Sequence, residues 1–356
     1  MDLDGGHAEL PAVNTHPARA GASAWRDPTL QATLRFAVGV TAAFVLCESL
    51  QWTPSFLAPV LTAVLLTSLP MRPPLKMAIG LMVVMTVTSL FAFAIASLLR
   101  DMPIVLFGLI SLCVFLAFYT MLNGRPPLPA LLLLICLATI PVVVMIAPAQ
   151  ASILPMALIR SMAVALLTIW AVYLLWPLTP PPKAAPAPPP GTTAPVTMAL
   201  GGVAVVMPLM LVYLLFGLAD VLPVMIATVM LVVNFDLQRG RMHALGMIIG
   251  NFAGGLLGAL LNTLLFTMPT LPFLSGLLFV LLLGFGQRVS AAGPAAGVAL
   301  LACNAMLIIL STAISSESAS LSLWLIRVLQ FALAGAFAVG MMSLIWHRAV
   351  NMPHAT

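Results

Sequence analysis

Residues 177–195 read PLTPPPKAAPAPPPGTTAP, and this proline-rich stretch separates two long apolar parts of the chain. Proline lacks a backbone donor and cannot continue a helix, so the stretch predicts an extended linker of polyproline type. We therefore place the one clear domain boundary at residues 179–195. A first unit then covers residues 31–178 and a second covers residues 196–348.

The composition on both sides of the linker indicates a membrane protein. Hydrophobic residues make up 62% of the chain and charged residues only 6%, whereas a soluble domain carries about 25% charged residues. So few charges cannot cover a water-facing surface, and the lipid bilayer is the expected solvent. The basic residues form no run or face, which argues against a nucleic-acid partner.

Twelve apolar segments are long enough, or nearly so, for membrane helices, which need about 17 to 25 residues. We expect them at Leu34–Leu50, Pro54–Leu69, Lys76–Leu99, Ile104–Leu122, Leu128–Ala147, Ile153–Leu178, Val196–Gly217, Val221–Asn234, His243–Phe266, Leu271–Gly286, Ala292–Ile314 and Leu321–Trp346. The second and eighth are short. Residues 1–30 lack the basic start and apolar core of a signal peptide and are expected to be a disordered tail. Residues 349–356 form a second tail.

The positions of the basic residues favour one topology. If the N-terminus is cytoplasmic, ten Lys and Arg residues fall on the cytoplasmic side: Arg19, Arg26, Arg72, Lys76, Arg125, Lys183, Arg239, Arg241, Arg288 and Arg348. Arg100 alone falls in an outer loop. This asymmetry follows the positive-inside rule, so we expect an all-α polytopic membrane protein of about twelve helices with both termini in the cytoplasm.

Three short matches in the same order indicate that the second unit repeats the first. LeuIleArg at 158–160 recurs at 325–327, LeuAlaProVal at 57–60 resembles ValLeuProVal at 221–224, and MetAlaIleGly at 77–80 resembles HisAlaLeuGly at 243–246. Because six helices return the chain to its starting side, the two units would be parallel repeats about an axis along the membrane normal. Chance similarity between apolar segments is the alternative.

Four ionisable residues within or beside the apolar segments are the first candidates for a solute pathway. Arg160 and Arg327 lie about two turns from the outer side into the last helix of each unit. Glu48 and Asp220 lie near the outer end of the first helix of each unit. Intramembrane charges are costly and usually functional. We expect the arginines to line the route of an anionic solute, each steadied by the acid of its own unit. Snorkelling of the arginine side chains to the interface is the alternative.

Two further clusters have a functional and a structural interpretation. Asp236, Arg239 and Arg241 are either a cytoplasmic entry site for anions or an inner loop that obeys the positive-inside rule. A row of glycines at a spacing of four residues favours close helix packing over a pore-lining face; its members are Gly246, Gly250, Gly254 and Gly258.

Several chemistries find no support in the sequence. The chain has no phosphate-binding GxxxxGK[ST] loop, no HExxH motif and no nucleophile arrangement. The four cysteines lie singly in apolar segments, as small buried hydrophobes do. We therefore expect no enzyme activity, no cofactor and no metal site.

The layout of each unit resembles the fusaric acid resistance and aromatic acid exporter (FUSC-like) superfamily of bacterial inner-membrane proteins. The resemblance lies in LeuArgPheAla at 34–37, the proline-marked second segment at Ala58-Pro59, and a short basic loop before a glycine-bearing third segment, at 72–80 and 241–258. It covers about residues 30–348 and implies efflux of aromatic carboxylates beside a periplasmic membrane-fusion protein and an outer-membrane channel. The well-known exporters carry large cytoplasmic domains, so this chain resembles a compact, membrane-only branch.

Three functions are therefore open. The first is an inner-membrane efflux permease for small organic anions, including aromatic ones, driven by the membrane potential or a proton gradient. The second is a non-transporting scaffold for a periplasmic partner, and the third is a major-facilitator-type carrier, although LPMRPPLKM at 69–77 fits the basic loop of that family poorly. A homo-oligomer is a further partner that the sequence leaves open.

Overall fold

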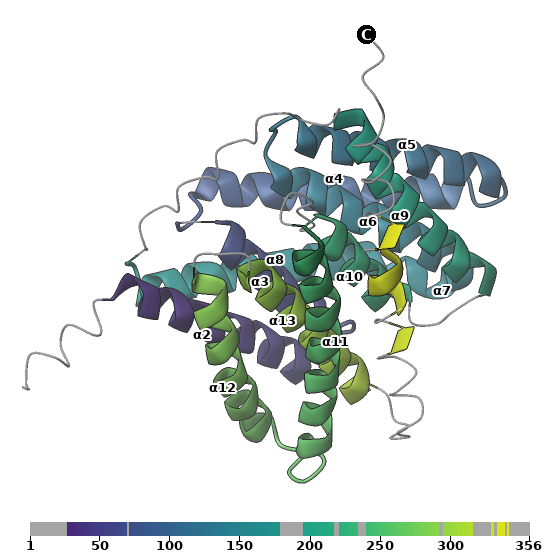
Figure 1. Ribbon diagram of the computed structural model, residues 1–356. Helices are drawn as coiled ribbons and strands as arrows, with labels where there is room; N and C mark the ends of the chain where they lie inside the picture. The colour runs from purple at the N-terminus through teal and green to yellow at the C-terminus, as the bar shows by residue number, and fades with distance from the viewer. Residues whose placement is uncertain are drawn as a thin grey trace, which may run out of the picture.

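The computed structural model describes residues 27–69, 71–178, 195–216, 221–233, 240–291, 295–315, 329–330, 333–338 and 340–341. Every regular element in these ranges is a helix (Figure 1). The helices are α2 (Pro28–Ser49), α3 (Leu57–Ser68), α4 (Leu75–Leu98), α5 (Pro103–Leu122), α6 (Pro127–Ile146), α7 (Pro148–Ala151), α8 (Ile153–Leu175), α9 (Pro195–Phe216), α10 (Val221–Val233), α11 (Gly240–Leu265), α12 (Leu271–Ser290) and α13 (Ala295–Ser315).

Nine of the described helices are long and apolar enough to cross a membrane. The chain is therefore a multi-pass α-helical membrane protein. Helices α3 and α10 occupy the two segments predicted to be short, with 12 and 13 residues. A helix of that length spans about 18–20 Å, less than the hydrocarbon thickness of about 30 Å. Of the twelfth predicted segment, the described residues between 329 and 341 are helical.

The start of α2 differs from the sequence expectation. The helix begins at Pro28, six residues before the predicted first segment and two before the predicted end of the tail. Asp27 is its N-cap, and its carboxylate accepts hydrogen bonds from the hydroxyl and backbone N–H of Thr29 at 2.6 and 2.9 Å. These bonds hold the pKa of Asp27 below its usual value. An Asp cap followed by proline at the first helical position is a strong start signal, because both satisfy or remove orphan N–H groups.

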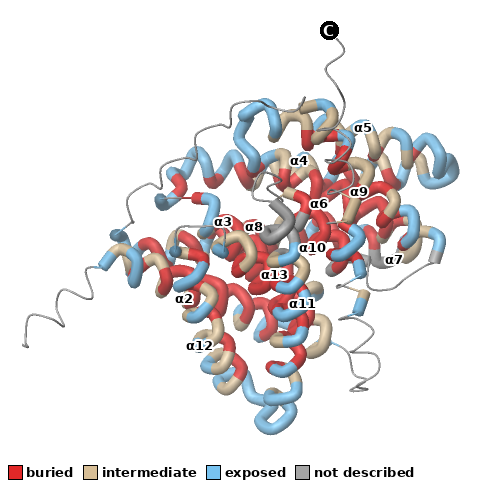
Figure 2. The backbone as a smooth tube through the Cα atoms, viewed as in Figure 1, coloured by how far each residue is buried: buried red, intermediate tan, exposed pale blue. Residues whose placement is uncertain are grey.

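Burial divides the helices into a central and a peripheral set (Figure 2). About two thirds of the residues in the membrane-length stretches of α6 and α13 are buried. The buried share is 28% in α4 and α5 and 22% in α12. The buried residues of α12 recur every three or four positions, and its opposite face is open. Peripheral helices with one buried stripe and an apolar outer face are what a lipid solvent permits.

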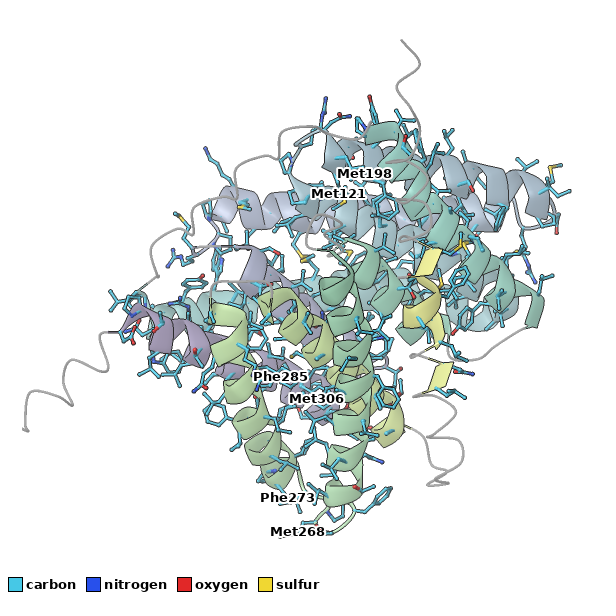
Figure 3. The ribbon with its side chains drawn as sticks, in the orientation of Figure 1. Met121, Met198, Met268, Phe273, Phe285 and Met306 are labelled. Carbon is cyan, nitrogen blue, oxygen red and sulfur yellow. The ribbon has the colours of Figure 1, made fainter. Side chains whose placement is uncertain are left out.

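The helix contacts cross between the parts of the chain before and after the linker. Helix α5 packs on α9, and α12 packs on α2. In Figure 3, Met121 near the end of α5 lies beside Met198 near the start of α9. Helix α4 packs on α6, and α11 packs on α13. The short helices are central: α3 contacts α2, α8 and α13, whereas α10 contacts α6, α9 and α13.

Candidate functional site at the two ends of α3

The most polar buried cluster lies where α2 ends and α3 begins. The Ser55 hydroxyl donates to Glu48 Oε1 at 2.5 Å, and the Ser55 and Ser311 hydroxyl oxygens lie 2.7 Å apart. Glu48 is 8% exposed, Ser55 3% and Ser311 1%. Since Ser311 belongs to α13, this network joins the two parts of the chain that the linker separates.

Arg160 of α8 lies at the same end of the bundle as Glu48. Its guanidinium carbon is 4.1 Å from the centroid of the Trp52 ring, and its Nη2 donates to the Thr53 carbonyl at 3.4 Å. Its Nε is buried and has no hydrogen-bond partner among the described residues. Within those residues Arg160 therefore contacts an aromatic face and a carbonyl, and the expected pairing with Glu48 is not made. We call Glu48, Trp52, Ser55, Arg160 and Ser311 the Glu48 cluster.

A buried cation, which the sequence analysis did not name as a site residue, lies at the other end of α2. Arg35 is 3% exposed, and its Nη1 donates to the carbonyls of Trp176 and Leu178 at 2.7 and 2.5 Å. Its guanidinium lies 4.5 Å from the centroid of the Tyr173 ring. The Leu178 N–H in turn donates to Gln31 Oε1 at 3.0 Å. These residues fix the end of α8 to the start of α2, and we call Gln31, Arg35 and Tyr173 the Arg35 cluster.

Helix α3 links the two clusters. Ser55 and Thr53 precede its first turn, and the Leu69 carbonyl that follows its last turn accepts a 3.3 Å hydrogen bond from the Tyr173 hydroxyl. Its N-cap residue, Phe56, makes no side-chain cap. The partly positive N-terminus of α3 therefore faces the end that holds Arg160, which makes this end of the buried core suited to a negative group.

The remaining predicted site residues are described only in part. Asp220, Asp236, Arg239 and Arg327 lie outside the described residues. Arg241 lies in the first turn of α11, but its side chain is outside the described set. Of the predicted solute pathway, the structure therefore places Glu48 and Arg160 at the same end of the bundle. The sequence alone did not indicate Ser55, Ser311 or Trp52 as site residues, because their roles depend on how α2, α8 and α13 pack.

The glycine row lies against α13. A Cβ built on Gly250 would lie 2.7 Å from Val298 Cγ1, and one on Gly258 would lie 2.6 Å from the Met306 carbonyl oxygen. At Gly254 it would overlap the backbone of Ala302. Gly246 has more room, since its nearest neighbour is Val298 Cγ2 at 3.7 Å. The row brings the backbones of α11 and α13 into direct contact.

The matches to known proteins are limited to the part of the chain before the linker. No curated protein and no solved structure matches the chain. The model of one family, described as "Protein of unknown function (DUF2955)", matches residues 32–175. That range runs from the first turns of α2 to the last residue of α8, and it contains every residue of the Glu48 cluster except Ser311.

Proposed function

We propose that the protein is a bacterial inner-membrane efflux permease for small organic anions, with aromatic acids as the class that fits the site best. The observation that carries the proposal is the Arg160 guanidinium stacked on Trp52 at the N-terminal end of α3. An arginine held on an aromatic face offers its remaining N–H groups to a carboxylate, and the ring offers a stacking surface for an aromatic acid.

We further propose that twelve helices form two parallel six-helix repeats with both termini in the cytoplasm. The helix contacts support this, because the following contacts keep a counterpart when every helix is replaced by the helix at the same position in the other unit. The pair α4–α6 corresponds to α11–α13, α5–α9 to α12–α2, α3–α13 to α10–α6, and α5–α6 to α12–α13. The family match to residues 32–175 supports the same boundary, because it covers one six-helix unit without the linker.

The two short helices support the location of the site. Helices α3 and α10 begin at matching places in the two units and carry Pro59 and Pro223 in their first turns. In repeat-built transporters, short or proline-interrupted segments at corresponding positions point to the binding site. Arg160 and Glu48 lie beside the start of α3. The proposed route therefore runs past one of the two helices that the sequence analysis predicted to be short.

The energetics favour export of such solutes. An inside-negative potential drives an anion outward by about 2.3 kcal/mol per charge per 100 mV. A proton entering through a buried carboxyl such as Glu48 would add drive. A periplasmic membrane-fusion protein and an outer-membrane channel are the partners that we propose for onward transfer.

The test is a deletion strain complemented with wild-type or variant protein. Cells are challenged with a panel of aromatic and aliphatic acids, and the efflux of labelled benzoate is then measured. We expect Arg160→Ala to weaken binding by about 1–2 kcal/mol, which is a loss of about 5- to 30-fold in apparent affinity, and Arg160→Lys to restore only part of it. Arg327→Ala is expected to abolish export while insertion stays normal.

The matched control is Arg72→Ala, because Arg72 also stacks on a tryptophan, 5.6 Å from the centroid of the Trp170 ring, but follows the far end of α3. Export should be unchanged in this variant at equal membrane levels. Equal export by Arg160→Ala and wild type would reject the anion site. A deletion strain that is sensitive to no acid in the panel would favour the scaffold function.

A further inference from the structure

The two opposite faces of α13 have different chemistry. One face, with Val298, Ala302 and Met306, packs against the glycine row of α11. Asn304 and Ser311 lie seven residues apart, which is two helical turns, so they share a face that is rotated by about half a turn from Ala302. Ser311 reaches Ser55 from this face. The polar face of α13 is therefore turned toward α3 and the short segment that joins α2 to α3.

Helix α2 repeats this spacing. Thr41 and Glu48 are also seven residues apart and share a face, two turns from one another along the helix. Glu48 and Ser311 are joined through Ser55 at the C-terminal ends of their helices. Two turns back, about 10 Å deeper along each helix, lie Thr41 and Asn304. Two polar rows of equal length thus start from the same network.

The deeper members of both rows have unmet hydrogen-bonding capacity. Thr41 is 9% exposed and Asn304 is 2% exposed, and neither Thr41 Oγ1 nor Asn304 Oδ1 has a hydrogen-bond partner among the described residues. Leaving a buried polar atom unsatisfied costs about 1–3 kcal/mol. Such atoms in native proteins are nearly always bonded, in many cases to buried water. Because two such atoms lie in rows that begin at the same network, they indicate that water molecules lie along both rows.

The network at the start of the rows has a defined donor order. An ionised Glu48 only accepts hydrogen bonds, so the single Ser55 proton goes to Glu48 and the Ser311 hydroxyl must donate to Ser55. When a proton from water reaches the Ser311 hydroxyl, Ser311 passes its own proton to Ser55, and Ser55 passes its own proton to the Glu48 carboxylate. Glu48 then donates to Ser55 and Ser55 donates to Ser311, so both hydrogen bonds reverse direction and neither is lost. Arg160 on α8, held on Trp52, is a charged group at the same end of the bundle.

We propose that the Thr41–Glu48 face of α2 and the Asn304–Ser311 face of α13 line a hydrated proton path between the two units, with Glu48 as its protonatable group. This inference rests on the proposed function only in naming the proton as the ion that drives export. The path itself is a property of the resting protein and can be tested without any transported acid.

The test uses single cysteines in a variant whose four native cysteines are replaced by alanine. Thr41→Cys and Ser311→Cys are nearly isosteric, and Asn304→Cys probes the deep end. The matched controls are Val40→Cys and Ile309→Cys, which are also buried, at 0% and 1% exposed, but not on the polar rows; Ile309 matches Ser311 and Asn304 most closely in burial. Membrane vesicles are treated with a cationic methanethiosulfonate reagent from either side. We expect reaction at the three row positions at least tenfold faster than at the controls.

A second measurement tests Glu48. At Ser311→Cys the ratio of the cationic to the anionic methanethiosulfonate rate should fall on acidification, and Glu48→Gln should lower the ratio and remove its pH dependence. Because both reagents react with the same thiolate, the ratio cancels its titration. Row positions that react no faster than the controls would overturn the hydrated path. An unchanged ratio in Glu48→Gln would overturn the role of Glu48. Both results are independent of whether benzoate is exported.

Discussion

Substitution of Gly254 by alanine should break the tightest helix contact that the structure describes. A Cβ at this position would lie 2.7 Å from Ala302 Cα and from its carbonyl carbon, and it would overlap the carbonyl oxygen. Ordinary carbon contacts are about 3.5–4.0 Å, so α11 and α13 must separate locally by about 1 Å. A gap of that size removes about a quarter to a half of the dispersion energy of each neighbouring contact.

The expected cost is at the upper end of the range for overpacking, about 3 kcal/mol, because the opposing atoms are backbone and cannot rotate away. The matched controls are Gly276→Ala and Gly284→Ala on α12, where a Cβ meets nothing within 4 Å. These should be neutral or stabilising, since alanine is favoured over glycine in helices by up to about 1 kcal/mol.

The measurement is thermal unfolding of the purified protein in detergent, followed with a thiol-reactive fluorogenic dye. Cys303, which follows Ala302, is fully buried and becomes reactive when α11 and α13 part. We expect the apparent Tm of Gly254→Ala to fall by several degrees relative to both controls. A Tm equal to that of Gly276→Ala would refute the backbone contact and with it the packing of α11 on α13.

Three further predictions concern the polar clusters. Arg35→Met should destabilise the fold by up to about 3–6 kcal/mol, because the Trp176 and Leu178 carbonyls lose charge-assisted bonds worth about 1.5–3 kcal/mol each, whereas Arg35→Lys should recover part of this in the same dye assay. The depressed pKa of Asp27 means that its cap stabilises α2 above the unfolded pKa of about 3.9 and that this stabilisation is lost as the pH falls through the lower folded value. The protection of the Thr29 amide, measured as its exchange rate in the unfolded chain divided by its observed rate, should therefore fall in acid, and much less so in Asp27→Asn. Ser55→Ala, Ser311→Ala and the double variant should show a coupling energy of about 0.5–1.5 kcal/mol, and strictly additive effects would contradict the network.

The helix positions could be predicted because each rests on local signals. Apolar length, proline at helix starts and the linker composition are properties of contiguous residues, so eleven expected segments agree with described helices to within a few residues at most ends. The predicted start of α2 is too late because Gln31 and Thr33 lower the hydropathy before Leu34. Both are nevertheless buried, and Gln31 accepts a hydrogen bond from the Leu178 N–H after α8. The short helix α7 was also missed, as it lies in a loop between two longer segments.

Of the candidate site, only the charged residues could be predicted from the sequence. Glu48 and Arg160 stand out because a charge in an apolar segment needs no structure to be noticed. Their partners do not, since Ser55 and Ser311 are 256 positions apart and single serines are common in membrane helices. The expected Glu48–Arg160 pair also rested on proximity in depth alone. The side-chain directions turn Glu48 toward Ser55 and Arg160 toward Trp52, and such directions depend on how the helices are rotated in the bundle.

Two of the contacts that cross the linker, α5–α9 and α12–α2, pair a glycine with a larger residue in opposite ways. Phe118 of α5 fits against Gly202 of α9, whose added Cβ would lie 2.7 Å from the ring. At the corresponding crossing the glycine is on the other member: Gly286 of α12 approaches the Thr33 carbonyl, where a Cβ would lie 3.0 Å away. A glycine meets a large side chain in both places. In the first contact the large side chain is on α5, the fourth described helix, whereas in the second it is Phe36 on α2, whose ring would lie 3.4 Å from the Cβ added to Gly286.

This exchange of large and small residues has a structural consequence. If α2 met α5 in place of α12, the Phe118 ring would have to occupy the space that Gly286 leaves for Thr33, and overpacking of that kind costs about 1–3 kcal/mol. If α9 met α12, two glycines would face one another and leave a void, which also costs stability. The complementary volumes therefore favour contact between the part of the chain before the linker and the part after it, which is the arrangement that the described helices have.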